Sequence, residues 1–316
     1  MGKTMTGEER LIQDFRRMMK GINAKGYKTR AAYMNHTEQF LKFYWRKFHG
    51  QKLANVRGDH IRAYVKEMQE KGLSPSTIKS RLSAIRFAHE KAGGKRRLPD
   101  NKELGLEKRK VGKEDRAWTA DEVKSGLTVA KNMGRIDAYN AIYIGYAFGL
   151  RIEEVCRIRK EDVEKALKYD GLTIKGKGGQ VRTYPVQFEV QKKALQYFYD
   201  YARKNKLMPH DYVISPQGKG GVERQINSLE NWMYANRDKF AMKNRKDEVR
   251  DGKKPRSENI TWHGLRHARA QIQYAKYKDE GRKDPKRMTS ETLGHHRPDI
   301  TNVYLAELPP SRQKKK

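Results

Sequence analysis

The chain has 316 residues, and its 70 lysines and arginines against 38 aspartates and glutamates give a formal net charge of +32 at pH 7. At roughly 150 residues per domain this length predicts two domains, and so large a positive excess predicts a polyanionic partner, with nucleic acid the first candidate. The single cysteine, Cys156, excludes an internal disulfide framework and a cysteine-based structural zinc site.

The longest apolar run, from Ala141 to Leu150, is too short to cross a bilayer. The N-terminus lacks the apolar core of a signal peptide. These features predict a soluble protein without a membrane span, in the cytoplasm.

Residues 1–94 read as a small domain of four helices. Thr6 and Glu9 form a capping box that predicts the first helix start, and apolar residues follow at helical spacing. Asp59 is the expected cap of the third helix, and Ser74 before Pro75 predicts the start of the fourth. We therefore expect a helical domain that ends at the glycine pair 93–94.

The fourth helix carries basic side chains that lie off its apolar stripe. A solvated basic face explains them as well as a DNA-binding face does, but the net charge of +32 favours contact with DNA phosphates. The predicted DNA-binding residues are Lys79, Arg81, Arg86 and Lys91.

Residues 95–117 are rich in charge and poor in apolar periodicity, which predicts a basic linker. A second domain, 118–316, begins with the capping box of Thr119 and Glu122. An apolar helix over about 137–150, a polar helix from 152 and a hairpin with strands near 172–174 and 181–186 follow, and helices dominate the remainder. The predicted fold class is mainly α with a small β-hairpin.

Four short motifs follow one another in this second domain. In chain order they are Gly149-Leu150-Arg151 with Glu154 three residues on, Gly176-Lys177-Gly178, His263-Gly264-Leu265-Arg266, and Leu293-Gly294-His295 followed by Tyr304. Each motif alone occurs by chance in many proteins. In this order, within a strongly basic chain, they resemble the tyrosine recombinase (phage integrase) family over residues 118–308. The helical domain resembles the family's core-binding domain, and we expect no separate arm-binding domain before it.

Phosphodiester cleavage without a metal needs fixed cations, because negative charge grows on the phosphate oxygens in the transition state. Arginine suits this task since its planar fork stays charged and binds two oxygens together. By resemblance, Arg151 and Arg266 are the two clamps and Tyr304 is the nucleophile. Three residues on, Glu154 can reach back on a helix to orient Arg151.

The resemblance also assigns the remaining site residues. Lys177 protonates the leaving 5′-oxygen, with Lys175 as the alternative, while His263 and His295 contact the phosphate or accept a proton. A nucleotide-binding loop ending at Lys177 is disfavoured because Gly178 stands where Ser or Thr is required. A zinc site at His263 is disfavoured because Arg266 would repel the cation.

The family implies a site-specific DNA recombinase or integrase that works through a 3′-phosphotyrosyl intermediate, with no metal, ATP or other cofactor. Its expected partners are double-stranded DNA with specific recombination sites, a dimer on each site, a homo-tetramer on DNA, and accessory DNA-bending proteins. We expect a cytoplasmic protein that associates with the nucleoid and is encoded by a prokaryote, a phage or another mobile element. Two alternatives remain open from the residues: a type IB-like topoisomerase and a non-catalytic DNA-binding regulator.

Overall fold

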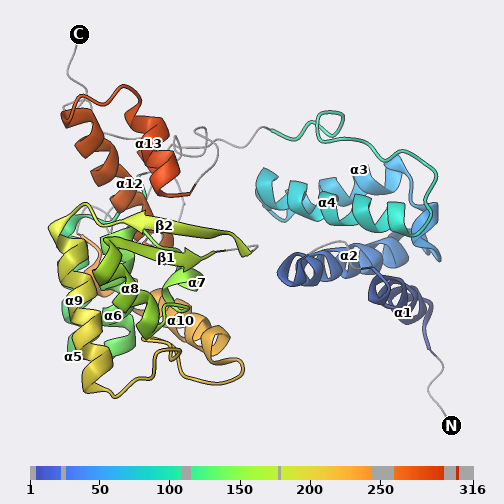
Figure 1. Ribbon diagram of the computed structural model, residues 1–316. Helices are drawn as coiled ribbons and strands as arrows, with labels where there is room; N and C mark the ends of the chain where they lie inside the picture. The colour runs from blue at the N-terminus through green and yellow to red at the C-terminus, as the bar shows by residue number, and fades with distance from the viewer. Residues whose placement is uncertain are drawn as a thin grey trace. The chain divides into compact units, whose positions relative to one another are not determined.

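The computed structural model describes residues 5–22, 26–107, 115–176, 179–242, 260–294 and 304–305. The chain divides into two compact units, Met1–Lys110 and Val111–Lys316 (Figure 1). Each unit has its own hydrophobic core. This division falls inside the stretch 95–117 that the sequence predicts as a linker.

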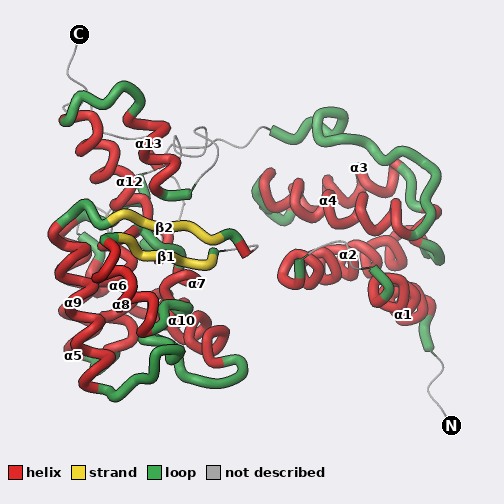
Figure 2. Tube along the Cα trace, in the orientation of Figure 1, coloured by secondary structure: helices red, strands yellow, loops and turns green. Residues whose placement is uncertain are grey.

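The first unit is helical throughout its described residues. Figure 2 shows this unit as helices joined by loops. Its elements are α1 (Gly7–Lys20), α2 (Tyr27–Phe48), the 3₁₀ turn η1 (Leu53–Asn55), α3 (Gly58–Glu70) and α4 (Pro75–Lys91). The expected four-helix domain is confirmed.

Local hydrogen bonds start these helices. At α1 the Glu9 amide donates to Thr6 Oγ1 over 3.2 Å and the Thr6 amide donates to Glu9 Oε2 over 2.8 Å, so the capping box is confirmed. The expectation for α3 was wrong. Asp59 lies inside the first turn, and the Arg57 amide before the helix donates to His60 Nδ1 over 3.1 Å.

Helix α2 packs against α1, α3 and α4, and their apolar faces form the core of the first unit. Leu98 and Leu106, which follow α4, are buried in that same core. Arg86 on α4 holds this segment by donating from Nε and Nη2 to the Pro99 carbonyl and from Nη1 to Asn101 Oδ1. The first part of the predicted linker therefore packs onto the helical unit.

The second unit is mostly helical and contains one small antiparallel sheet in its described residues. In chain order its elements are α5 (Ala120–Asn132), α6 (Ile136–Phe148), α7 (Ile152–Val155), α8 (Lys160–Tyr169), β1 (Gly171–Lys175), β2 (Val181–Pro185), α9 (Glu189–Lys204), α10 (Gly221–Phe240), α12 (Trp262–Asp279) and α13 (Pro285–Thr292). The predicted fold class, mainly α with a β-hairpin, is confirmed.

Helix α6 lies at the centre of the second unit. It packs against α5, α7, α9, α10 and α12, and most of its residues are buried. A helix enclosed on all sides must be apolar on all faces, which explains the apolar run that the sequence shows here. Its position brings the residue after its C-terminus, Gly149, to α12 and the end of α13.

The hairpin pairs Leu172 with Tyr184 and Ile174 with Arg182. Because side chains alternate along a strand, these four residues share one face of the sheet. Leu172, Ile174 and Tyr184 on this face are buried in the core. Arg182 is the charged residue on the buried face.

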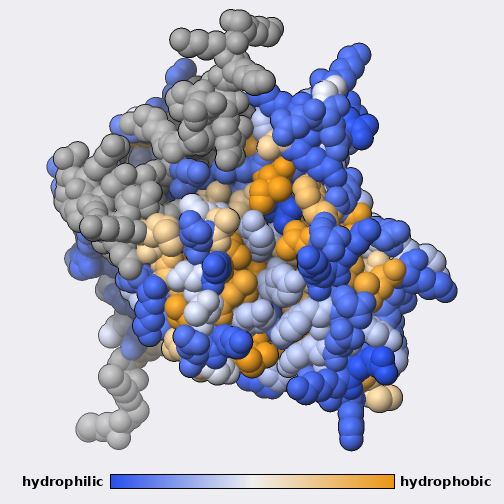
Figure 3. Space-filling model, turned by 90° about the vertical axis from the view of Figure 1, so that its left-hand side faces the viewer, coloured by the Kyte–Doolittle hydropathy of each residue, from blue (hydrophilic) through white to orange (hydrophobic). Residues whose placement is uncertain are grey.

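Figure 3 draws one face, on which hydrophilic residues cover most of the described surface and apolar residues gather toward the middle. Within the described ranges, none of the helices combines the length and the apolar character needed to cross a bilayer.

Candidate active site

The site begins where α6 ends. Gly149 has a left-handed backbone (φ 69°), and a Cβ at this position would lie 2.9 Å from the Arg269 Cβ on α12. Glycine is therefore required both by the backbone and by the close approach of the two helices. This turn ends α6 and sets Arg151 directly before α7.

Arg151 is held by Glu154. Its amide donates to Glu154 Oε2 over 2.9 Å, and its Nη1 donates to Glu154 Oε1 over 3.0 Å. Glu154 is 2% exposed, whereas the Arg151 side chain is 31% exposed. A buried carboxylate thus orients a guanidinium that still has an open side toward solvent, as the spacing of the two residues predicts.

Arg266 on α12 is fully buried and joins separate segments. Its Nη1 donates to the Gly149 carbonyl over 2.8 Å and to the Tyr184 hydroxyl over 3.4 Å, and its Nη2 donates to the Leu293 carbonyl. Burial opposes the charge of Arg266. The oxygens of Tyr184, Tyr304 and Glu154 outweigh it, so the pKa of Arg266 is raised.

Tyr304 lies beside two histidines of α12. Its hydroxyl is 3.1 Å from His263 Nε2, and its ring centroid is 4.2 Å from that of His267. Only 5% of Tyr304 is exposed, and it packs against Ala270 and Leu293. The chain thus brings together a phenol and an imidazole that are 41 positions apart.

The two histidines are neutral at physiological pH. Part of His263 is open to solvent, but the surrounding protein and then the charges of Arg266, Arg151 and Arg116 lower its pKa to about 4. Burial is the first cause that lowers the pKa of His267 to about 3. At pH 7 the nitrogen of His263 that carries no hydrogen is therefore available as a proton acceptor.

Two predicted site residues, Lys177 and His295, lie outside the described residues. The residues directly before them are described. A Cβ on Gly176 would lie 3.0 Å from Glu154 Oε1, and Gly294 lies against Arg182. The alternative lysine, Lys175, is exposed at the end of β1.

Sequence reasoning missed three residues near this site: Arg116, Arg182 and Tyr184. Arg182 Nη2 donates to Glu154 Oε1 over 3.0 Å, and the Tyr184 hydroxyl donates to Glu154 Oε2 over 3.4 Å. A signal for Arg182 was present in the sequence, because it alternates with a buried aromatic residue along a predicted strand. A charged residue on the buried face of a strand needs a partner.

The basic residues predicted on α4 have different surroundings. Arg86 uses its three guanidinium nitrogens within the unit, as described above, and burial lowers its pKa. Arg81 is half-buried beside Tyr64, and its positive charge acts on the Tyr64 phenol. Lys79 donates to the Glu107 carbonyl, whereas Lys91 is exposed. Of the four, Lys91 is the most accessible to a phosphate.

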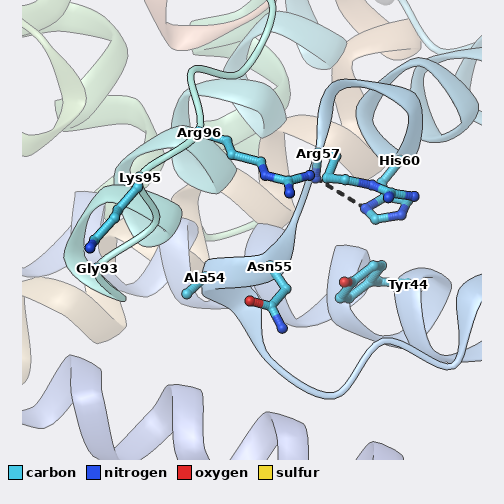
Figure 4. Close-up of a pocket in the computed structure, with 8 residues that line it drawn as sticks. All are labelled: Tyr44, Ala54, Asn55, Arg57, His60, Gly93, Lys95 and Arg96. Carbon is cyan, nitrogen blue, oxygen red and sulfur yellow. Dashed lines mark hydrogen bonds between the residues drawn. The ribbon is translucent and has the colours of Figure 1, made fainter.

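A second group of basic residues surrounds a hollow of about 590 Å³ in the first unit. Figure 4 shows Lys95 and Arg96 on the segment after α4, with Arg57 and His60 at the start of α3. The other described residues that line it are Tyr44, Ala54, Asn55 and Gly93, so no carboxylate is among the described lining residues. The Arg57 guanidinium pairs with Asp59 over 2.9 Å. It is a candidate surface for an anionic partner.

Residues 11–96 match the phage integrase N-terminal SAM-like domain, and residues 116–309 match the phage integrase family. The chain belongs to the phage integrase family. The resemblance that the motifs carried is confirmed, and this recombinase is an enzyme of the tyrosine site-specific class.

Two relatives of this chain are named as recombinases, in agreement with the family match. It is 25% identical over 219 residues to tyrosine recombinase XerC of Bacillus pumilus, covering 66% of this chain and 68% of that protein. It is 27% identical over 164 residues to recombinase cre of Escherichia phage P1, covering 44% of this chain and 46% of that protein.

Solved structures with a similar fold include a lambda integrase(75-356) dimer bound to a COC′ core site. The TM-score is 0.62 at 17% identity, with 93% of each chain covered. A lambda integrase tetramer bound to a Holliday junction gives a TM-score of 0.61 at 15% identity, covering 93% of this chain and 76% of that one. These likenesses agree with the fold described above.

Proposed function

We propose that this recombinase cleaves and rejoins DNA at specific sites by attack of Tyr304 on the scissile phosphate, which forms a 3′-phosphotyrosyl bond. One observation carries the proposal: the Tyr304 hydroxyl lies 3.1 Å from His263 Nε2, in the electrostatic field of Arg266. A nucleophile and a neutral base within hydrogen-bond distance are the arrangement that activation of a hydroxyl requires.

Each described residue then has a role in the attack. His263, neutral because its pKa is about 4, accepts the phenol proton. The exposed side of Arg151 binds the phosphate oxygens, and the buried Arg266 adds positive charge to the site.

The proposal assigns the remaining chemistry to Lys177 and His295 on the family pattern. Lys177 protonates the leaving 5′-oxygen, and His295 contacts the phosphate. The phosphotyrosyl bond conserves the free energy of the broken phosphodiester, so resealing needs neither ATP nor a metal. Relatives solved with DNA support a dimer on each site and a tetramer during strand exchange.

For the first unit, we propose that the hollow lined by Arg57, Lys95 and Arg96 contacts the DNA backbone together with Lys91. The net charge of +32 and the absence of a carboxylate among the described residues that line the hollow support this assignment. Each phosphate contact releases counterions, so affinity should fall steeply with added salt.

The test is adduct trapping on nicked suicide duplexes that tile the DNA adjoining the gene of this chain. The wild-type protein should form a covalent complex that survives denaturant, whereas Tyr304→Phe should bind the same duplex without forming one. Tyr234→Phe is the matched control, since Tyr234 is 73% exposed in the same unit. Adducts that persist in Tyr304→Phe refute the nucleophile, and their absence in the wild type refutes cleavage.

A further inference from the structure

One side chain, Arg182 on β2, connects three segments that are far apart in the sequence. Its Nη2 donates over 3.0 Å to Oε1 of Glu154, which lies on α7. Its Nη1 donates to two carbonyls that directly follow α13, those of Leu293 over 3.1 Å and Gly294 over 3.2 Å. The side chain is 15% exposed.

Two glycines make room for this guanidinium. A Cβ on Gly176 would lie 2.5 Å from Arg182 Nη2, and a Cβ on Gly294 would lie 2.3 Å from Arg182 Nη1. Gly294 also has a left-handed backbone (φ 64°), which favours glycine independently. The guanidinium therefore lies between two turns. Lys177 directly follows Gly176, and His295 directly follows Gly294.

A buried carboxylate and backbone carbonyls hold the Arg182 guanidinium in position. Glu154 is 2% exposed and accepts from both Arg151 and Arg182, so one buried carboxylate balances two guanidiniums. The Leu293 carbonyl likewise accepts from both Arg266 and Arg182. Both terminal nitrogens of Arg182 are thus engaged within the protein, which distinguishes it from Arg151 with its open side.

We propose that Arg182 is a positioning residue for DNA cleavage. It ties the Leu293 and Gly294 carbonyls to Glu154, which orients Arg151, and it packs against Gly176. Planar forked donors suit this task, because one guanidinium serves a carboxylate on one edge and carbonyls on another. The inference rests on the proposed cleavage by Tyr304.

The test compares Arg182→Gln and Arg182→Lys with the wild type in the suicide-duplex assay. Arg157→Gln is the matched control, because Arg157 makes an exposed ion pair with Glu223 in the same unit. Two quantities are measured separately: the dissociation constant for the duplex, and the rate of adduct formation at saturating protein. Circular dichroism melting sets an assay temperature at which every variant is folded.

Misplaced catalytic groups slow the reaction without weakening binding, so we expect Arg182→Gln to form adducts about 100-fold more slowly than the wild type. Its dissociation constant should stay within about threefold, less than 1 kcal/mol in binding. Arg182→Lys should recover part of the rate, since an ammonium keeps the charge but lacks the fork. Arg157→Gln should match the wild type.

Three results would overturn the proposal. They are an Arg182→Gln rate close to that of the wild type, a loss explained entirely by weaker DNA binding, and an Arg182→Lys rate no higher than that of Arg182→Gln. If Arg182→Gln does not fold, Arg182→Lys decides: a wild-type rate overturns the proposal and a reduced rate at unchanged affinity supports it. Failure of the wild type to form adducts is a separate result, which refutes cleavage itself.

Discussion

The stability of the second unit should fall between pH 7 and pH 5 because His267 stays neutral when folded. Its pKa is about 3 in the folded protein, with burial as the first cause, against about 6.5 for an unfolded histidine. At pH 5 the unfolded chain therefore binds a proton that the folded chain does not. Protonation then favours the unfolded state, so stability declines as the pH drops below about 6.5.

The magnitude follows from these two pKa values. Between pH 7 and pH 5 the unfolded histidine goes from mostly neutral to almost fully protonated, which is worth about 2 kcal/mol. His263 contributes in the same direction, but less, because its partly exposed ring is screened by solvent. The general charge repulsion of a chain at +32 also grows at low pH, so a comparison with a variant is needed.

The assay is urea unfolding at both pH values, followed by tryptophan fluorescence. Trp118, Trp232 and Trp262 are buried in the core of the second unit and report its unfolding. His267→Gln should lose about 2 kcal/mol less than the wild type on going from pH 7 to pH 5. His210→Gln, which removes an exposed histidine of the same unit, should behave as the wild type does. Parallel losses in wild type and His267→Gln would refute the reasoning.

Three further predictions concern residues of the two units. Arg86→Met should destabilise the first unit by about 1–3 kcal/mol, because it removes hydrogen bonds to the segment after α4, yet leave DNA affinity nearly unchanged. The double variant Lys95→Ala, Arg96→Ala should do the opposite, lowering the salt slope of DNA binding in anisotropy titrations by about 2; an unchanged slope excludes the hollow from the DNA-contact surface. Burial raises the pKa of Cys156 to about 12, so an aromatic disulfide reagent at pH 8 should label it only after denaturation. Rapid labelling of the native protein would contradict this.

Much of the fold could be predicted because its signals are local. The capping boxes at Thr6 and Thr119 depend on residues three positions apart, and both are present. The hairpin follows from strand alternation on either side of a glycine-rich turn. Asp59 shows the limit of such signals, because the neighbouring His60 makes the capping interaction instead.

The candidate site was predicted in part, and the reason lies in the range of its contacts. The motifs named Arg151, His263, Arg266 and Tyr304, and the structure brings them together. They did not name Arg182, whose partners are 28 and about 111 positions away. Nor could they show that Arg86 donates to the Pro99 backbone carbonyl, although it lies off the apolar stripe of its helix.

The sequence by itself determined the helical character, the hairpin, the need for an anionic partner and the family, since periodicity, composition and motif order survive without coordinates. Only the tertiary structure decided which charges are available to a ligand and which are engaged inside the protein. The physical reason is that a guanidinium is used by whatever acceptor lies within about 3 Å of it. That distance is set by the packing of α6, α12 and the hairpin, not by spacing along the chain.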